Sequence, residues 1–361
     1  TIDLIMKMKS ILTLLLTSLL AASGLHAAKK NTPVWTSLDA ANIPVSVKIQ
    51  GEYLGQINGG GKIGAQVIAL GGDNYQAVML PGGLPGAGWD GKNKILLDGS
   101  KKDGGLLFHS TNGKGKGYLQ EDPARFSATR KNPPNGNKAY SGVISEGALQ
   151  GKTDDGKSFE LRRVIRTSPT LGMKPPKDAK VLFDGTSKAA FQGGRLDEKT
   201  KLLNTDGRDI RTVDKLSNYQ MHVEFMLPYR PDARGQGRGN SGFYQVDMYE
   251  VQILDSFGLE GLDNECGGVY KKANSLVNMC LPPLQWQTYD VDFTNAVAEG
   301  GKKTKNARMT FRHNGVVIHD DLDINGKTGG SRKDPEGTPG QIRFQGHGNP
   351  LQFRNIWVIS K

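Results

Sequence analysis

Short runs of alternating apolar and polar residues, closed at each end by Gly, Asn, Asp or Pro, recur along most of this chain and limit its fold most strongly. The chain has 48 glycines among 361 residues, and few stretches repeat apolar residues at the helical period of about 3.6. Because side chains of a strand point alternately to its two faces, such runs predict strands joined by turns. We therefore expect an all-β protein.

The alternating runs fall into two groups. In the first group, strands are expected at residues 45–53, 62–69, 75–80, 105–109, 139–145, 148–153 and 158–166. In the second group, strands are expected at residues 219–227, 242–247, 249–254, 286–293, 307–313, 316–322, 340–344 and 351–359. Asp155-Gly156 and Asn314-Gly315 separate consecutive strands, as in tight hairpins. Many short strands of this kind predict a β-sandwich or barrel.

A proline-rich stretch separates the two groups. Residues 168–179 carry three prolines and show no alternation, which is typical of a linker. This linker would divide a smaller N-terminal β domain, residues 28–167, from a second β domain, residues 180–361. No convergent set of chemical groups marks the first domain, so its role stays open, with an accessory role expected.

The N-terminus has the pattern of a secretory signal peptide. Lys7 and Lys9 supply positive charge, residues 11–22 form an apolar run, and small residues surround Ala27. The run is shorter than the roughly 20 residues of a membrane helix. We expect a signal peptide over residues 1–27 and a periplasmic or secreted mature protein, with an uncleaved anchor as the alternative.

The positive net charge does not form a nucleic-acid-binding pattern. The chain has 47 Lys and Arg against 36 Asp and Glu, a net charge of +11. Its basic residues are scattered singly or in pairs, and no basic run is flanked by stacking aromatic residues. No later apolar stretch has the length of a membrane helix. We expect no nucleic-acid partner, and no membrane span once the signal peptide is removed.

Cys266 and Cys280 are the two cysteines of the chain. An even pair of cysteines in an oxidising compartment favours a disulfide. We therefore expect these two to be bridged, with two buried thiols as the alternative. Two cysteines without further ligands make a poor zinc site.

Two of the predicted strands carry an unusual set of polar side chains. Glu250 and Gln252 share one face of residues 249–254, and Gln345 and His347 share a face near the end of the chain. Gln, Asn, His, Tyr and Arg side chains hold sugar hydroxyls in fixed hydrogen-bond geometry. A sheet face lined by them, with an aromatic ring nearby, predicts a carbohydrate site. An ordinary solvated sheet face is the alternative.

The second domain also resembles a known family. Its motifs occur in the family's order over residues 181–361: VLFDGT, GNSGFYQ, YEVQILDS, CGGVY, WQTYDVDF, HNGVVIHD and IRFQGHGNPLQFRNIW. On these motifs it is similar to the 3-keto-disaccharide hydrolase domain family of exported bacterial proteins. The resemblance implies a concanavalin-A-like jelly-roll β-sandwich of two antiparallel sheets. The first half resembles the β extension that precedes this domain in planctomycete-type relatives.

The resemblance implies cleavage of glycosides already oxidised to a ketone at C3. Such a ketone makes the C2 proton acidic, so that a base can remove it and the anomeric substituent can leave by elimination; water can then add for net hydrolysis. The site needs a general base, a group that stabilises the enolate and an acid for the leaving oxygen. It does not need the two opposed carboxylates of an ordinary glycosidase.

The residue types suggest roles in this implied chemistry. Glu250 is expected as the base and Arg354 as the group that holds the enolate. His347 is expected as acid or base, because the ordinary histidine pKa of about 6.5 suits both roles. The expected substrate-binding residues are Asn240, Gln252, Asp255, Tyr270, Trp286 and Gln345. Asp255 has turn capping as an alternative role, and Trp286 has a place in the core.

Two positions depart from the family's pattern. Lys271-Lys272 follow CGGVY, where small or neutral residues are expected, and Gly346 stands where an acidic residue commonly precedes the last histidine. No His-x-His, EF-hand or Cys-x-x-Cys pattern marks a metal site. No cofactor is firmly implied, and a divalent metal ion held by Glu250 and His347 is the one candidate.

Two functions of different classes stay open at this point. One is an enzyme that cleaves a 3-keto-disaccharide or related oligosaccharide substrate. The other is a non-catalytic, lectin-like carbohydrate-binding module, which needs polar and stacking residues but no base. A laminarinase-type glycosidase fits poorly, because it would place several carboxylates along the strand that carries Gln252. The linkage cleaved and the oligomeric state do not follow from the sequence.

Overall fold

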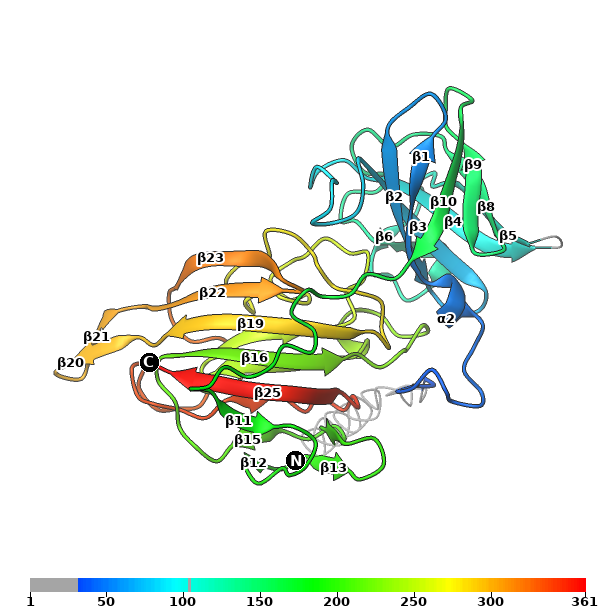
Figure 1. The fold of residues 1–361 in the computed structure, drawn as a ribbon. Coiled ribbons are helices and arrows are strands. Elements are labelled where there is room, and N and C mark those ends of the chain that lie inside the picture. The colour runs from blue at the N-terminus through cyan, green and yellow to red at the C-terminus, as the bar shows by residue number, and fades with distance from the viewer. Residues whose placement is uncertain (1–31, 103–104) are drawn as a thin grey trace, which may run out of the picture. The chain divides into compact units, whose positions relative to one another are not determined.

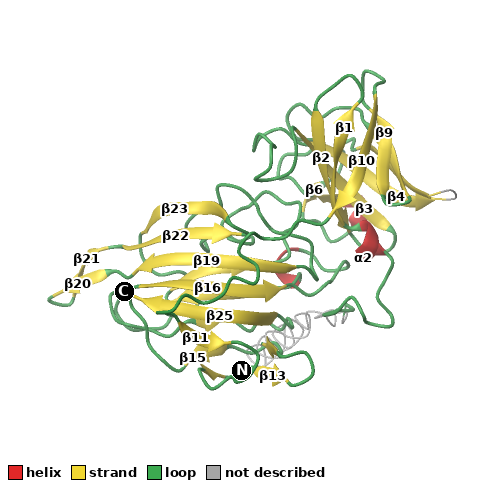
Figure 2. Cartoon of the chain, in the orientation of Figure 1, coloured by secondary structure: helices red, strands yellow, loops and turns green. Residues whose placement is uncertain are grey.

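The computed structural model describes residues 32–102 and 105–361, so the predicted signal peptide lies outside the described residues. Residues 34–361 form one compact unit. The described chain consists mainly of strands and turns, with one short α-helix, α2 (Ser46–Ile49) (Figure 2). It contains no helix that is both long and apolar enough to cross a membrane. The predicted all-β fold class is confirmed.

The first half forms a closed antiparallel barrel (Figure 1). Around the barrel the strands follow the order β1-β10-β9-β8-β5-β4-β3-β2. Their bounds are β1 (Gly51–Ile57), β2 (Lys62–Ala69), β3 (Asn74–Pro81), β4 (Ile95–Lys102), β5 (Gly105–Ser110), β8 (Ser141–Ser145), β9 (Ala148–Lys152) and β10 (Ser158–Val164). The connection from β5 to β8 contains β6 (Gly117–Tyr118), the 3-10 turn η1 (Pro123–Arg125) and β7 (Phe126–Ser127).

One predicted strand in this half is partly wrong and one observed strand was not predicted, for physical reasons. The run predicted as a strand at residues 45–53 begins as helix α2, because a single helical turn that buries only Val47 also satisfies its short apolar pattern. Strand β4 was missed because its Asp98-Gly99 pair has the composition of a turn. Its neighbours Leu96 and Leu97 are both buried, in two different core clusters, so this strand shows no alternation.

The second half forms a β-sandwich of two antiparallel sheets. The larger sheet has the order β13-β14-β25-β16-β19-β22-β23, with β11 also paired to β25, and Figure 1 shows its long strands side by side. Its strands are β11 (Lys180–Phe183), β13 (Arg195–Asp197), β14 (Leu202–Asn204), β16 (Tyr219–Met226), β19 (Trp286–Thr294), β22 (Ala307–His313), β23 (Val316–Ile324) and β25 (Gln352–Ser360).

The smaller sheet has the order β12-β15-β24-β17-β18. Its strands are β12 (Phe191–Gln192), β15 (Ile210–Thr212), β17 (Ser241–Gln245), β18 (Tyr249–Ile253) and β24 (Arg343–Phe344). A separate two-stranded ribbon pairs β20 (Val297–Glu299) with β21 (Lys302–Lys305), and the 3-10 turn η2 (Gly235–Gly237) precedes β17. This arrangement of two sheets confirms the predicted C-terminal sandwich.

An aromatic core joins the two sheets. Phe243 of β17 stacks on Phe344 of β24 with ring centroids 5.3 Å apart, and it meets Phe311 of β22 edge-on at 6.1 Å. Tyr249 of β18 packs on Phe293 of β19 at 5.7 Å. These buried rings contribute much of the hydrophobic stabilisation. Because they take one face of β17 and β18, the side chains of Tyr244, Glu250 and Gln252 lie on the opposite face.

The segment predicted as a linker is hydrogen-bonded to the larger sheet. The Oγ of Ser168 lies 2.6 Å from the Oγ1 of Thr288, and the Oγ1 of Thr170 donates to Asp290 at 2.7 Å. The backbone N–H of Gly172 donates to a carboxylate oxygen of the larger sheet at 2.6 Å. Residues 168–172 therefore belong to the folded surface of the sandwich.

The predicted disulfide is not formed, because Cys266 and Cys280 are free thiols in the core. The Sγ of Cys266 lies 3.1 Å from the hydroxyl of Tyr289, and the Sγ of Cys280 contacts the carbonyl of Leu254 at 3.5 Å. Each sulfur thus has its own polar partner, and both side chains pack as small apolar groups. The disulfide prediction was wrong, and the alternative of two buried thiols holds.

Candidate active site

The register of one hairpin builds a polar face in the sandwich. Strands β17 and β18 pair so that Gly242 lies opposite Gln252 and Tyr244 lies opposite Glu250. Residues opposite each other in an antiparallel pair project to the same face, here the face turned away from the aromatic core. Strand β24 adds Arg343 opposite Tyr244. Three short strands therefore gather a carboxyl, an amide, a phenol and a guanidinium.

This polar face forms one wall of a cavity of about 330 Å³. The cavity is lined by Gln236, Asn240, Tyr244, Glu250, Gln252, Tyr270, Lys271, Gly329, Gly330, Gln345 and His347. Six of the nine predicted site residues are among them: Asn240, Glu250, Gln252, Tyr270, Gln345 and His347. Larger cavities exist elsewhere, but this one combines a buried carboxyl, a phenol, an imidazole and a lysine, which is the composition of a catalytic site.

Glu250 is the buried acid of this cavity. It is only 4% exposed, and burial raises the pKa of its carboxyl to about 7, against the opposing effects of the Tyr244 hydrogen bond and the Arg343 charge. A carboxyl with this pKa exchanges protons near neutral pH, as a general base must. Gly242 provides the necessary room, since a Cβ there would lie 2.3 Å from the Oε1 of Glu250.

The Tyr244 hydroxyl lies between two acceptors. Its oxygen is 2.8 Å from the Oε2 of Glu250 and 2.9 Å from the carbonyl oxygen of Gly329. A phenol has one hydrogen to donate, so the hydrogen goes to Glu250 when that group is ionised, and to Gly329 when the carboxyl is protonated and itself donates. Burial raises the pKa of Tyr244, so the phenol acts as a donor at neutral pH. Its hydrogen bond therefore follows the charge of Glu250.

Arg343 holds the Tyr244 ring in place. The central carbon of its guanidinium lies 3.7 Å from the ring centroid, a cation–π contact. Its Nη2 donates to the carbonyl of Gly330 at 2.7 Å, and its Nε lies 2.8 Å from a carboxylate oxygen of Asp247. These contacts fix the guanidinium, and the Tyr244 ring that packs on it is therefore fixed as well. The Tyr244 hydroxyl is thereby held in position to bond Glu250.

A chain of amides forms a second wall of the cavity. The Nε2 of Gln252 donates to the Oδ1 of Asn240 at 2.7 Å, and the Nδ2 of Asn240 donates to the Oε1 of Gln236 at 3.0 Å. Each amide thereby sets the orientation of the next. Donors and acceptors held in fixed directions are what recognition of sugar hydroxyls requires.

The rim of the cavity carries Tyr270, Lys271 and His347. The backbone N–H of Tyr270 donates to the carbonyl of Glu250 at 3.1 Å, which ties the rim to β18. Lys271 has a left-handed φ of 56°, and its Nζ lies 5.4 Å from the Tyr270 ring centroid. His347 is exposed. The rim thus adds a positive charge and an imidazole to the buried carboxyl.

The departure from the family pattern at Gly346 has a steric reason. A Cβ at this position would lie 2.1 Å from the backbone of Arg208. Real Cβ contacts are never that short, so neither an acidic residue nor any other side chain fits here without moving the backbone. No carboxylate can therefore reach His347 from the preceding position.

Three predicted site residues lie away from the cavity. Arg354 of β25 and Trp286 of β19 are on the outer face of the larger sheet, where the guanidinium lies 4.0 Å from the Trp286 ring centroid and donates to Glu224 at 2.7 Å. Asp255 is buried in an ion pair with Arg238, with 2.5 Å between Oδ2 and Nε. These three side chains therefore do not line the cavity, because β19 and β25 belong to the larger sheet and Asp255, just after β18, is bound by Arg238.

Comparison with known proteins connects this site to a family. Residues 178–359, about half of the chain, match the family described as 3-keto-alpha-glucoside-1,2-lyase-like domain. The chain belongs to this family. It is therefore a carbohydrate-active protein, and the resemblance drawn from the sequence motifs is confirmed. No curated protein matches the chain.

Solved structures give more distant similarities. A proposed glycosyl hydrolase from Parabacteroides distasonis ATCC 8503 is 29% identical, and the similarity covers 52% of this chain and 85% of that one with a TM-score of 0.46. A second proposed glycosyl hydrolase from the same organism is 18% identical over 55% of this chain and 98% of that one, with a TM-score of 0.38. The assignment to the lyase-like family rests on the match over residues 178–359.

Sequence reasoning gave no role to two residues that line the cavity of the lyase-like domain, Tyr244 and Lys271. Tyr244 stands in the GNSGFYQ motif, and pairing this strand with the next as a hairpin would have placed it opposite Glu250. The connecting residues Val246 and Asp247 adopt left-handed φ angles of 46° and 56°. They are not the glycine or asparagine that signals a tight hairpin, so the pairing was not evident.

The cavity of the lyase-like domain holds both predicted metal ligands, Glu250 and His347. Among residues 32–102 and 105–361, no three His, Cys, Asp or Glu side chains are grouped to hold a metal ion. Divalent cations such as Ca²⁺ and Mg²⁺ prefer several oxygen ligands. A carboxylate and an imidazole would therefore need amide oxygens of the cavity or water to complete the shell.

Proposed function

We propose that this protein cleaves 3-keto-glycosides, including 3-keto-disaccharides, by removing the proton at C2 and expelling the anomeric substituent. The observation that carries the proposal is the buried Glu250 carboxyl, with a pKa of about 7 and a hydrogen bond from Tyr244, in the wall of a polar cavity. A carboxylate of this kind is ionised in part at neutral pH and basic enough to accept an acidified proton.

The proposed reaction has two steps. In the first, the C2–H bond breaks, the proton moves to Glu250, and the electron pair forms the enolate with negative charge on the C3 oxygen. In the second, the C3 carbonyl re-forms, a double bond forms between C1 and C2, and the bond from C1 to the leaving oxygen breaks. The leaving oxygen takes a proton from an acid. Addition of water across the new double bond would complete a net hydrolysis.

Three further groups have proposed roles. Lys271 takes the role first assigned to Arg354, because it is the cation that lines the cavity and can stabilise the enolate oxygen. His347 supplies the proton to the leaving oxygen. When Glu250 takes up the C2 proton, the Tyr244 hydroxyl turns its hydrogen to the Gly329 carbonyl and accepts a hydrogen bond from Glu250.

A lectin-like module is the second candidate function. The amide chain of Gln252, Asn240 and Gln236 would serve hydroxyl binding equally well without catalysis. What favours the enzyme is Glu250, because a binding module gains nothing from a carboxyl whose pKa is raised by burial. The two functions differ in whether a 3-keto substrate is consumed.

The test is incubation of the purified protein with 3-keto-lactose and 3-keto-trehalose, followed by NMR. We expect both or one of them to be consumed, and Glu250→Gln to abolish turnover while sparing affinity for the unoxidised disaccharide. Glu299→Gln, an exposed glutamate of the β20–β21 ribbon, is the matched control and should react like the parent. Binding of sugars without consumption of either ketone would refute the enzyme. Repeating the assay with a chelator reports whether a divalent metal ion contributes.

Export is part of the proposal. The N-terminal pattern of Lys7, Lys9 and the apolar run before Ala27 supports a signal peptide over residues 1–27. Fractionation of expressing cells, with N-terminal sequencing of the mature chain, should find the protein outside the cytoplasm and starting near residue 28. A cytoplasmic chain with an intact N-terminus would refute this part.

A further inference from the structure

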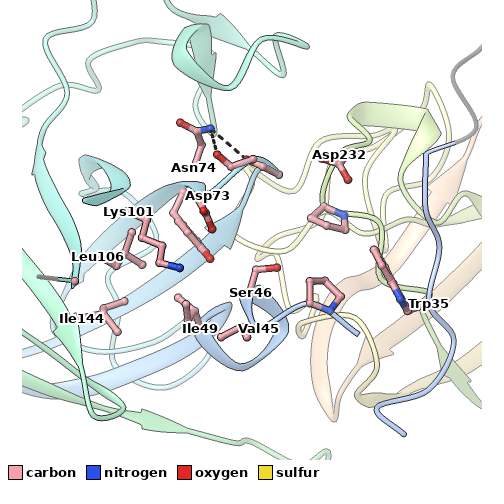
Figure 3. Close-up of a pocket in the computed structure, with 16 residues that line it drawn as sticks. Trp35, Val45, Ser46, Ile49, Asp73, Asn74, Lys101, Leu106, Ile144 and Asp232 are labelled. Atoms are coloured by element: carbon pink, nitrogen blue, oxygen red, sulfur yellow. Dashed lines mark hydrogen bonds between the residues drawn. The ribbon is translucent and has the colours of Figure 1, made fainter. Parts of the chain in front are cut away.

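A second cavity, of about 530 Å³, is separate from the candidate active site and shares no lining residue with it. It is formed by the N-terminal segment, one end of the barrel and a loop of the sandwich, and its principal polar and aromatic residues are Trp35, Ser46, Asp73, Tyr75, Lys101 and Asp232 (Figure 3). Cavities of about 300–1,000 Å³ between folded parts are the usual places for small-molecule binding.

Three solvent-exposed charged side chains line this cavity. In Figure 3, Asp73 and Lys101 lie on one side, and Asp232 lies on the other near Trp35. Within residues 32–102 and 105–361, none of these three side chains makes an ion pair or a hydrogen bond. Their carboxylate oxygens and ammonium hydrogens are therefore available to the hydroxyl groups of a ligand.

The charge balance disfavours an anionic ligand. Asp73 and Asp232 contribute two negative charges and Lys101 contributes one positive charge, which leaves the cavity with a net charge of −1. An anionic ligand would be repelled by this balance. A purely apolar ligand would bury the charged groups without replacing their water, at a considerable cost in free energy.

Trp35 is held as a rigid aromatic wall. Its backbone exchanges two hydrogen bonds with Tyr229, at 3.1 and 2.8 Å, and its indole Nε1 donates to the Oδ1 of Asn42 at 3.2 Å. Its ring packs on the Tyr229 ring with centroids 5.9 Å apart. The indole is nevertheless only half-buried. A fixed, partly open indole offers apolar contact area at a small entropy cost, and the C–H face of a sugar ring packs on such a surface.

The loop beside Asp232 is also built for one conformation. Gly71, Gly72 and Asp73 have left-handed φ angles of 80°, 53° and 60°, a conformation that costs energy for the aspartate. The Nδ2 of Asn74 holds this loop by donating to the carbonyls of Gly71 and Gly72 at 3.3 and 2.7 Å, as Figure 3 shows. A Cβ at Gly71 would lie 1.9 Å from the Oδ1 of Asp232. Only glycine at position 71 therefore leaves room for the Asp232 side chain against this loop.

We propose that this cavity binds a neutral oligosaccharide. Trp35 supplies the stacking surface, and Asp73, Asp232 and Lys101 bind the hydroxyls. Such a site would give the N-terminal half of the chain a role of its own in holding a glycan. The proposal does not depend on the reaction at Glu250.

The test is isothermal titration of the full chain with cellotriose and maltotriose, and with trigalacturonate as an anionic probe of similar size. We expect at least one neutral trisaccharide to bind, and trigalacturonate to bind more weakly. Trp35→Ala should weaken the neutral ligand about fivefold to tenfold, the size expected for loss of an aromatic contact. Trp89→Ala removes another half-buried indole, held by a bond to the Asn93 carbonyl outside the cavity, and should leave the affinity unchanged.

Asp232→Asn and Asp73→Asn keep the side-chain shape and test the site without removing the indole that anchors the N-terminal segment. Each should weaken the same neutral ligand, with an unchanged melting temperature. The proposal is overturned if neither neutral trisaccharide binds, or if trigalacturonate binds at least as tightly. It is also overturned if binding survives in all the Trp35 and aspartate variants but is lost in Gln252→Ala, because the ligand would then occupy the candidate active site.

Discussion

Replacement of Glu250 by glutamine is expected to make the protein more stable while it abolishes turnover. Burial raises the pKa of this carboxyl from 4.5 to about 7 in the folded state. Ionisation therefore costs the folded protein free energy that the unfolded chain does not lose. At about 1.4 kcal/mol for each pKa unit, the full cost is about 3 kcal/mol.

The sign of this effect sets its pH dependence. Below the unfolded pKa of 4.5 the carboxyl is protonated in both states, so its burial costs nothing of this kind. As the pH rises from 4.5 to about 7, the unfolded chain ionises first and the folded state loses stability. Above that range the loss is constant. Near the unfolded pKa of 4.5, Glu250→Gln should therefore have the same free energy of unfolding as the parent. At about pH 8.5 its free energy of unfolding should be larger by about 3 kcal/mol.

Urea unfolding followed by tryptophan fluorescence measures the difference, with linear extrapolation at each of several pH values between about 4.5 and 8.5. Glu299→Gln replaces an exposed glutamate, so its free energy of unfolding should differ from that of the parent by an amount that does not change with pH. A Glu250→Gln difference that is the same at all pH values would refute the account of burial. So would an acidic limb of kcat/KM centred near the ordinary glutamate pKa rather than near 7.

Three further substitutions test the surroundings of this carboxyl. Tyr244→Phe removes a hydrogen bond that lowers the Glu250 pKa, so the acidic limb of kcat/KM should move up by about one pH unit; an unmoved profile would show that the bond has no influence. Gly242→Ala puts a Cβ 2.3 Å from the Glu250 carboxylate and should cost about 1–3 kcal/mol in urea unfolding together with most of the turnover; a stable, active variant would contradict this geometry. Arg354→Ala leaves the buried Glu224 without its 2.7 Å partner and should cost about 2 kcal/mol of stability with kcat unchanged; a large loss of kcat in the folded variant would return Arg354 to the site.

Local sequence was sufficient for most of the strands and for part of the site. Alternation in residues 249–254 placed Glu250 and Gln252 on one face, and the structure puts both in the cavity wall. The same reasoning could not place Arg354, whose strand β25 joins the larger sheet and turns it to the outer face. Alternation shows that two residues share a face, but not which sheet provides that face.

The sequence by itself determined the all-β class, most strand positions, and the set of polar residues that the family shares, because turn residues and the two-residue period act over short distances. Only the tertiary structure decided which of these residues meet. The hairpin register brings Tyr244 to Glu250, the backbone of Arg208 excludes any side chain at Gly346, and burial gives Glu250 its pKa of about 7. These properties arise from strand register, close packing and desolvation, which the alternation pattern of a single strand does not record.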